Sequence, residues 1–549
     1  MATDQLMHLV GRVPLASLRL PRPTAMPRLG EVAALAGAAL LVALLFVPHI
    51  VGTGFYDDGW QYLAQYRFAP KPGFFGAVQN FSENSFRPGQ MLYWPVKYGL
   101  FGAHPWAHLT WTVVWAIAMS VALFVLLRQL GVPRTHSTVI ALLVLIFPAS
   151  DANRLWADAD VGPFAITLFL IGANLSVHAF RRGGKDALAL HAAGLLFYLA
   201  SVLTYEIAAT TILLSIALYA WCAPLRLALK RWAVDAVSVG ATLVFVTSNT
   251  FYAHLPLRDQ ASHAVEVAKG GAALITPALL PFGTAPRWLG LLVAAPVIAA
   301  AAITVRRLPH DDPRAAALRR LLGAAAAGIV AAGVAWLMFV PSAEFAPLDP
   351  AERNRVNGLA AVGLVVLAYS VVLIAGQLLA QWRRRDVLRV VVPAVACTAI
   401  AVGYAVKIEQ DGAAWDRAAD DQAHVLTVIG QTVRNPPRGA TVYTLGAPLY
   451  TQDAVPVFAA TWDLRGALST RWSDPTLHAY PMPDGATYSC ASDSITMHSG
   501  NDEFAVQRGV YGRTFVVDVP RRRSIPVRSS ADCRSLARVI ATNEPVSSE

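Results

Sequence analysis

Charged residues and cysteines are scarce in this chain. Only 15% of its 549 residues are Asp, Glu, Lys or Arg, whereas 55% are hydrophobic. A soluble domain has about 25% charged residues, so this composition argues against a cytosolic enzyme. The four cysteines are too few for a disulfide scaffold, and none belongs to a CxxC pair.

Several catalytic motifs are also missing. The sequence contains no HExxH, Walker A, GxSxG or Rossmann fingerprint. Metalloprotease, ATPase and serine hydrolase functions therefore lack support. Because no nucleotide-phosphate loop is present, a nucleotide sugar is also a poor candidate for a substrate.

Long hydrophobic runs without charge are what the chain does contain. A helix needs about 20 apolar residues to cross the hydrocarbon core of a bilayer, and about eleven runs approach this length. The predicted spans are 31–51, 106–127, 136–150, 161–180, 187–204, 206–223, 232–252, 287–305, 321–340, 356–380 and 390–408. The first run is too long and too late for a cleaved signal, so we expect it to remain as an anchor.

The basic residues indicate how these spans are oriented. Lys and Arg number 45 against 35 Asp and Glu, and most basic clusters fall at every second connection between the runs. This alternation follows the positive-inside rule and disfavours nucleic-acid binding. It places the N-terminus in the cytoplasm, and an odd number of spans then places the C-terminal segment outside.

We therefore predict an α-helical polytopic membrane protein of about eleven transmembrane helices, in a bacterial cytoplasmic membrane. Its parts are a cytoplasmic segment 1–30, a membrane domain 31–408 with a long first external loop 52–105, and a small extracytoplasmic α/β domain 409–549. In that domain, the pattern predicts one helix and two strands: 416–433, 441–445 and 514–519. Cys490 and Cys533 both lie there, where an oxidising environment favours a disulfide.

The first external loop opens with two adjacent carboxylates, Asp57 and Asp58. Such a pair is repulsive and costly to desolvate unless a cation, a basic group or water compensates it. It can bind a divalent cation such as Mg²⁺ or Mn²⁺ with a phosphate, or act as a general base toward an acceptor hydroxyl. A solvated helix cap is the alternative interpretation. Arg87, later in this aromatic-rich loop, can clamp a lipid-linked phosphate or simply contact phospholipid.

The second external turn is short and dense in charge. Arg154 with Asp158 or Asp160, beside Trp156, can form an anion or sugar site. The alternative is that these charges only pair with one another in a wet loop.

Three further charged residues lie at the ends of predicted spans. Glu206 is a lone carboxylate between two apolar runs, which is costly and marks it as a functional candidate, or as a turn residue in headgroup water. Arg353 and Arg355 form a second candidate phosphate clamp, or a pair of charges that flanks a span.

These features resemble the GT-C superfamily of membrane glycosyltransferases. The resemblance is carried by an early span, by Phe55-Tyr56-Asp57-Asp58 at the start of the first external loop and by Arg87-Pro88. Within the superfamily, the chain is most similar to the protein O-mannosyltransferase, aminoarabinose transferase and O-antigen glucosyltransferase relatives. The acidic cluster 151–160 and Tyr205-Glu206 are similar to positions in that group, and the resemblance covers 30 to about 410.

The resemblance implies a polyprenyl-phosphate sugar as donor and transfer on the external face to an envelope glycan, lipid or protein. It implies that Asp57 or Asp58 deprotonates the acceptor or holds a divalent cation, and that arginines such as Arg87, Arg353 and Arg355 hold the lipid phosphate. We expect inversion in one step. The chain departs from the family in lacking a MIR-like or tetratricopeptide appendage, and segment 409–549 matches no named domain.

Three other functions are alternatives to that of a hexosyl- or pentosyltransferase. A transporter or flippase also needs many spans, although transporters place ionisable residues near the midplane and not at the external rim. An O-antigen polymerase or ligase would have its large loop late in the chain. A non-catalytic envelope-assembly protein would use the C-terminal domain for binding. The candidate catalytic residues are Asp57, Asp58 and Glu206, and the candidate substrate-binding residues are Arg87, Arg154, Asp158, Asp160, Arg353 and Arg355.

Overall fold

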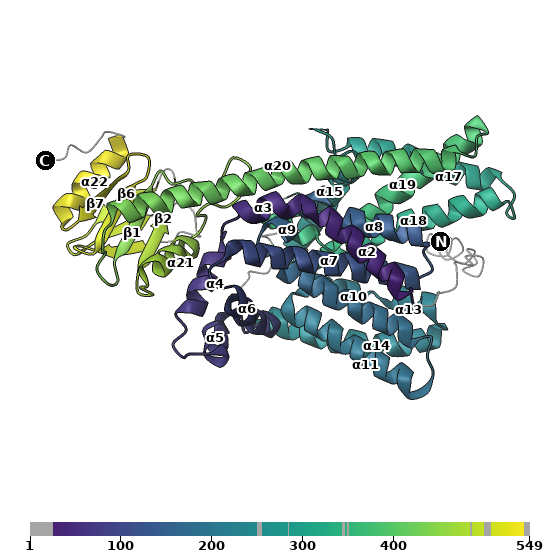
Figure 1. Ribbon diagram of the computed structural model, residues 1–549, viewed down its shortest axis with the longest axis horizontal. Helices are drawn as coiled ribbons and strands as arrows, with labels where there is room; N and C mark the ends of the chain where they lie inside the picture. The colour runs from purple at the N-terminus through teal and green to yellow at the C-terminus, as the bar shows by residue number, and fades with distance from the viewer. Residues whose placement is uncertain are drawn as a thin grey trace.

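The computed structural model describes residues 26–249, 255–283, 285–342, 346–348, 351–483, 486–498 and 507–542. It consists of a large bundle of helices and, at the opposite end of the molecule, a small domain that contains the strands (Figure 1). Most of the predicted cytoplasmic segment 1–30 lies outside the described residues.

Eight helical segments in the described ranges are long and apolar enough to cross a membrane, and they coincide with eight of the eleven predicted spans. The chain is thus an integral membrane protein, as its composition indicates. The segments are α2 (Leu29–Ala43) with η2 (Leu44–Phe46) and α3 (Val47–Gly52), α7 (Pro105–Gln129), α10 (Val161–Ala179), α11 (Gly184–Thr204), α17 (Leu289–Arg307), α18 (Pro313–Trp336) with η6 (Leu337–Phe339), α19 (Ala360–Arg383) and α20 (Leu388–Thr432).

The other three predicted spans are helical, but their helices are not both long and apolar enough to cross a membrane. Run 136–150 forms α8 (Arg134–Leu145), which has only 12 residues, and η4 (Pro148–Ser150). Run 206–223 is broken into η5 (Glu206–Ala208), α12 (Ala209–Leu213) and α13 (Ile216–Cys222). Run 232–252 lies largely in α14 (Leu225–Asn249), which buries Asp235. Hydropathy reports apolar length, and it cannot distinguish a continuous helix from a broken one.

The connections near the C-terminal domain are also helical. The predicted first external loop folds into α4 (Asp58–Arg67), α5 (Phe74–Asn80), η3 (Ser82–Asn84) and α6 (Pro88–Phe101). Pro88 occupies the first turn of α6, where a missing N–H costs nothing. The remaining short helices are α9 (Ala152–Leu155), α15 (Leu257–Ala273), α16 (Ile275–Leu279) and η7 (Ala351–Asn357).

One continuous helix joins the two parts of the molecule. The sequence predicted a span 390–408 and a separate helix 416–433, but α20 runs without a break for 45 residues, about 68 Å at 1.5 Å per residue (Figure 1). The hydroxyl of Tyr56 donates to the carbonyl of Trp415, 2.7 Å away, and the two rings meet edge to face. These contacts hold the start of α4 against the middle of α20.

The C-terminal domain is an α/β unit, as predicted. Its main sheet has the order β2-β1-β6-β7, in which β1, β2 and β6 are parallel and β7 is antiparallel to β6. A second, antiparallel sheet has the order β3-β4-β5. The elements are β1 (Thr441–Leu445), α21 (Thr461–Trp472), β2 (His478–Pro481), β3 (Thr487–Cys490), β4 (Ser494–His498), β5 (Gln507–Val510), β6 (Thr514–Asp518), β7 (Arg523–Val527) and α22 (Ser530–Thr542).

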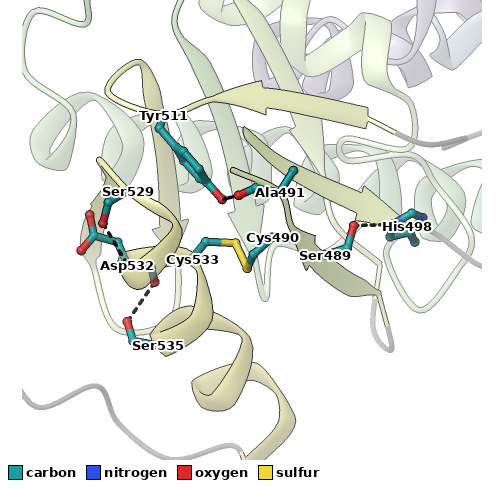
Figure 2. Close-up of a disulfide and its surroundings, with 9 residues drawn as sticks. All are labelled: Ser489, Cys490, Ala491, His498, Tyr511, Ser529, Asp532, Cys533 and Ser535. Carbon is teal, nitrogen blue, oxygen red and sulfur yellow. Dashed lines mark hydrogen bonds between the residues drawn. A yellow bond between two sulfur atoms is a disulfide. The ribbon is translucent and has the colours of Figure 1, made fainter. Parts of the chain in front are cut away.

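Two sequence predictions for this domain can be compared directly with the structure. The predicted strand 441–445 is β1, and 514–519 is β6 with one residue less. Cys490 and Cys533 form a disulfide that ties the end of β3 to α22 (Figure 2). The bond closes a segment of 43 residues and so restricts the unfolded chain.

Candidate functional site

A cavity of about 510 Å³ lies where the ends of several spans meet the C-terminal domain. This volume is typical of a small-molecule site. Six predicted site residues line it: Asp57, Asp58, Arg87, Asp158, Arg353 and Arg355. The other lining residues are Gln61, Tyr62, Glu83, Asn84, Gln90, Trp94, Asn153, Trp156, Ala159, Val161, Gly162, Tyr205, Glu352, Tyr450, Ala459, Ala460 and Trp462.

Asp57 is held in an unusual backbone conformation at the start of α4. Its φ of 47° lies in the left-handed region, which a non-glycine residue adopts at a cost. The preceding Phe55 and Tyr56 are buried, and the indole N–H of Trp156 donates to the carbonyl of Tyr56 at 3.2 Å. These anchors maintain the strained turn. The carboxylate Oδ1 of Asp57 accepts a hydrogen bond of 3.1 Å from Trp462 Nε1.

Asp58 has a different environment from its neighbour. Burial raises the pKa of its carboxyl well above the ordinary value, and the negative charges of Asp57 and Asp158 raise it further. The positive charge of Arg355 and a hydrogen bond of 3.4 Å from the Tyr62 hydroxyl act in the opposite direction. Asp58 therefore holds its proton to a higher pH than an exposed aspartate does.

Arg87 and Glu206 form one unit, although 119 positions separate them in the sequence. The guanidinium binds the carboxylate through two hydrogen bonds, of which Nε to Oε2 measures 2.8 Å. It also lies over the rings of Phe86 and Tyr205, at 5.0 and 4.9 Å from their centroids. Arg87 lines the cavity and Glu206 does not. Glu206 thus orients the guanidinium of Arg87 without lining the cavity itself, whereas the sequence predicted a catalytic role for it.

The second arginine pair lies on η7, on another side of the cavity. The guanidinium of Arg355 stacks over Trp156, with its carbon 4.8 Å from the ring centroid. The side chain of Asn153 donates to the carbonyl of Arg355 at 3.0 Å, and Asn354 accepts from the backbone N–H of Ala152 at 3.1 Å. Helix α9 therefore fixes the short helix that carries both arginines.

A buried lysine that sequence reasoning did not select organises the acidic cluster. Lys97 is 1% exposed, and its Nζ lies 3.1 Å from both Asp158 Oδ1 and Asp160 Oδ1. Tyr98 also donates to Asp158, and Tyr93 to Asp160. A lone lysine inside the otherwise uncharged run 88–101 was the signal that could have identified it. Because burying a charge is costly, such a lysine needs a partner.

Asp158 and Asp160 differ in their access to the cavity. Asp160 does not line the cavity, and burial raises its pKa to about 6 against the opposing charge of Lys97. Asp158 does line it, and its Oδ2 has no hydrogen-bond partner among the described residues. That oxygen abuts Gly59, where a Cβ atom would clash with it.

Arg154 lies away from the cavity, unlike the prediction for it. Its guanidinium donates to the carbonyl of Phe147 and to Ser150 Oγ, and only 1% of the residue is exposed. Burial lowers its pKa to about 10, while Asp151 acts in the opposite direction. The side chain of Arg154 thus joins α9 to the preceding turn. Packing directs the guanidinium into the interior and not into the cavity.

Asp57 and Asp58, the predicted ligands of a divalent cation, are not joined by a third ligand of this kind in the described ranges. Within the described ranges, no group of three or more His, Cys, Asp or Glu side chains could hold a metal ion. One oxygen of Asp57 already accepts an indole N–H. Among the described residues, Asp57 and Asp58 can therefore supply only part of a coordination shell, and the divalent cation stays a prediction.

No protein-family model matches the chain, and no curated protein matches it. Among solved structures, the chain is similar to ArnT from Cupriavidus metallidurans bound to undecaprenyl phosphate, with 15% identity, a TM-score of 0.32, and coverage of 82% of this chain and 86% of that chain. It is also similar to the same protein in the apo state, with 14% identity, a TM-score of 0.36, and coverage of 82% and 85%.

Proposed function

We propose that the chain is a membrane glycosyltransferase that moves a hexose or pentose from a polyprenyl-phosphate donor to an acceptor hydroxyl. The observation that carries this proposal is the pairing, in one cavity, of adjacent carboxylates with a set of arginines: Asp57, Asp58, Arg87, Arg353 and Arg355. Glycosyl transfer from a phosphate needs a proton acceptor on one side and anion stabilisation on the other.

The arginines are suited to the leaving group. As the bond between sugar and phosphate breaks, negative charge develops on the phosphate oxygen, and guanidinium groups stabilise it without losing a proton. Arg87 is already oriented by Glu206, and Arg355 by stacking on Trp156. Little reorganisation is therefore needed when the phosphate arrives.

Asp57 is the better candidate for the base. A base must be anionic, and the hydrogen bond from Trp462 stabilises the anion of Asp57. Asp58 tends to remain protonated because its pKa is raised by burial and by Asp57. The acceptor oxygen would attack the anomeric carbon and pass its proton to Asp57, while the bonding electrons leave with the phosphate. The outcome is inversion in one step.

The placement of the cavity fits a reaction at the membrane surface. Its walls come from segments that begin or end spans: α4 follows α3, α9 precedes α10, and η7 precedes α19. With the N-terminus in the cytoplasm, this end and the segment 409–549 would lie outside a bacterial inner membrane. The acceptor would then be an envelope glycan, lipid or protein.

The test uses purified protein in nanodiscs with radiolabelled polyprenyl-phosphate hexoses and pentoses, and measures release or transfer of the sugar. Asp57→Asn should lower the transfer rate by about 10² to 10⁴-fold, the usual contribution of a general base. Its affinity for undecaprenyl phosphate should stay within about twofold, since the arginines are intact. Asp311→Asn, at an exposed carboxylate between α17 and α18, is the matched control.

Full transfer by Asp57→Asn would show that the base lies elsewhere. If the wild type neither turns over nor binds any lipid-linked sugar, the glycosyltransferase proposal fails. A lipid-scrambling assay in the same nanodisc-derived liposomes would then test the flippase alternative.

A further inference from the structure

The C-terminal domain contributes a wall of the cavity. Trp462, at the start of α21, lines it and is 36% exposed. Tyr450, Ala459 and Ala460, from the connection between β1 and α21, lie on the same wall. This connection leaves the carboxyl end of a parallel strand, where α/β domains commonly place ligand-binding residues.

Trp462 is held firmly against the membrane domain. Helices α21 and α4 pack side by side (Figure 1). The backbone of Gly466 lies so close to the carbonyl of Trp60 that a Cβ atom would clash with it. Farther along, Arg67 donates to the carbonyl of Thr470 at 3.0 Å and to Ser473 Oγ at 3.1 Å. The indole therefore has a fixed position relative to Asp57.

The chemistry of this wall suits a sugar ring. The N–H of Trp462 is used by Asp57, and the residue is partly exposed on the cavity wall. The partly positive C–H groups of a pyranose or furanose pack favourably on the negative face of an aromatic ring. Gln61 and Glu83, hydrogen bonded to each other at 3.1 Å on the same cavity, offer donors and acceptors for hydroxyl groups.

We propose that Trp462 is the platform on which the acceptor sugar stacks, so that the acceptor is a saccharide. This inference rests on the proposed function, because it takes Asp57 as the base. The acceptor hydroxyl must come within about 3 Å of that base. Since the indole N–H of Trp462 is hydrogen bonded to Asp57, the ring that bears the hydroxyl lies beside the indole. The phosphate-binding arginines come instead from the residue that precedes α6 and from η7.

Two variants separate the ring from the N–H. Trp462→Phe keeps an aromatic face and loses the donor, whereas Trp462→Gln keeps a donor and loses the face. Trp382→Phe and Trp382→Gln are matched controls, since Trp382 is 70% exposed and lies outside the cavity. All are purified as the full chain in nanodiscs.

The first measurement is binding to an array of fluorescent hexose, pentose and N-acetylhexosamine oligosaccharides, with undecaprenyl phosphate as the probe of the donor site. Loss of the aromatic face removes the contacts that the C–H groups of a sugar ring make with it. Trp462→Gln should therefore bind the preferred glycan at least about fivefold more weakly, and Trp462→Phe within about threefold of the wild type. Neither change should alter the affinity for undecaprenyl phosphate.

Equal glycan binding by the wild type and Trp462→Gln overturns the inference, as does an equal loss of donor affinity. No glycan binding by the wild type also overturns it, and favours a lipid or protein acceptor. If sugar transfer is absent but glycan binding still depends on the ring of Trp462, the proposed function fails while the saccharide platform stands. Where transfer is present, the KM for the acceptor should rise in Trp462→Gln with kcat nearly unchanged.

Discussion

At the scale of single residues, the environment gives two adjacent carboxylates different properties. Asp57 is stabilised as an anion by the indole N–H of Trp462. Asp58 has a raised pKa because of burial and the charges of Asp57 and Asp158. The raised pKa lets Asp58 stay neutral while a second carboxylate lies beside it.

This difference predicts a pH dependence of phosphate binding. Below its raised pKa, Asp58 is neutral; above that pKa, it adds a negative charge beside Arg355 and repels an anionic ligand. The affinity for undecaprenyl phosphate should thus fall as the pH rises through this pKa. In Asp58→Asn that decrease should be absent. Binding isotherms between about pH 4 and 8 check this.

Ionisation of the phosphate itself affects both proteins equally, so the difference between the two curves isolates Asp58. The other groups that face it are Asp57, Asp158, Arg355 and Tyr62, and all four are retained in the variant. Curves that run parallel at every pH would contradict the prediction.

At the scale of elements, a glycine determines how α4 meets the buried acidic cluster. Gly59 follows the two aspartates, and Oδ2 of Asp158 lies where its Cβ would be. Lys97 and Tyr98 hold Asp158 in place, so the carboxylate cannot easily give way. The close approach requires glycine because any side chain would push α4 outward.

Gly59→Ala should displace Asp57 and Asp58 relative to the arginines. A displacement of about 1 Å lowers a rate by about 10²-fold, so transfer should fall by this order while the protein remains folded. Gly37→Ala in α2 is the control, because nothing lies within 4 Å of the Cβ it would add. Transfer rates and size-exclusion profiles of both variants provide the measurement. Normal transfer by Gly59→Ala would show that α4 tolerates the shift.

At the scale of the whole molecule, the cavity depends on how the C-terminal domain sits on the membrane domain. Helix α20 carries the domain outward, and α21 returns to pack on α4 (Figure 1). Arg67 and Gly466 lie in that contact, on opposite partners. The wall that includes Trp462 exists only in the docked arrangement.

Gly466→Leu should separate α21 from α4, because even a Cβ atom would meet the Trp60 carbonyl. We expect faster hydrogen exchange in α4 and α21 and loss of glycan transfer, with affinity for undecaprenyl phosphate retained, since the arginines belong to the membrane domain. Gly323→Leu in α18, with nothing within 4 Å of its Cβ, is the control. Unchanged exchange in α21 would contradict the importance of this contact.

Several features could be predicted because they depend on local pattern. The apolar runs of α7 and α19, the β-branched and aromatic residues of β1 and the adjacent Asp57 and Asp58 are all visible within a few residues. The disulfide between Cys490 and Cys533 was predicted because both cysteines lie in one domain that we expected in an oxidising compartment. Each of these needs only composition, period or compartment.

Other features were beyond the reach of the sequence because they depend on contacts between distant residues. Arg87 and Glu206 look like separate candidates until packing joins them. Arg154 carries the same charge as Arg355, but it lies in the interior and Arg355 in the cavity. Nothing near Trp462 in the sequence indicates that it meets Asp57, 405 positions earlier.

Sequence alone establishes a helical membrane protein with a C-terminal α/β domain, because hydrophobic length and residue period are local properties. It also determined that acidic and basic groups gather at the ends of the spans, since charge is excluded from their middles. The tertiary structure alone decided which of those charges share one cavity, which are neutralised by Lys97 or Glu206, and that the C-terminal domain completes the wall. Those outcomes depend on the packing of α4, α6, η7 and α21, and only packing brings residues hundreds of positions apart into contact.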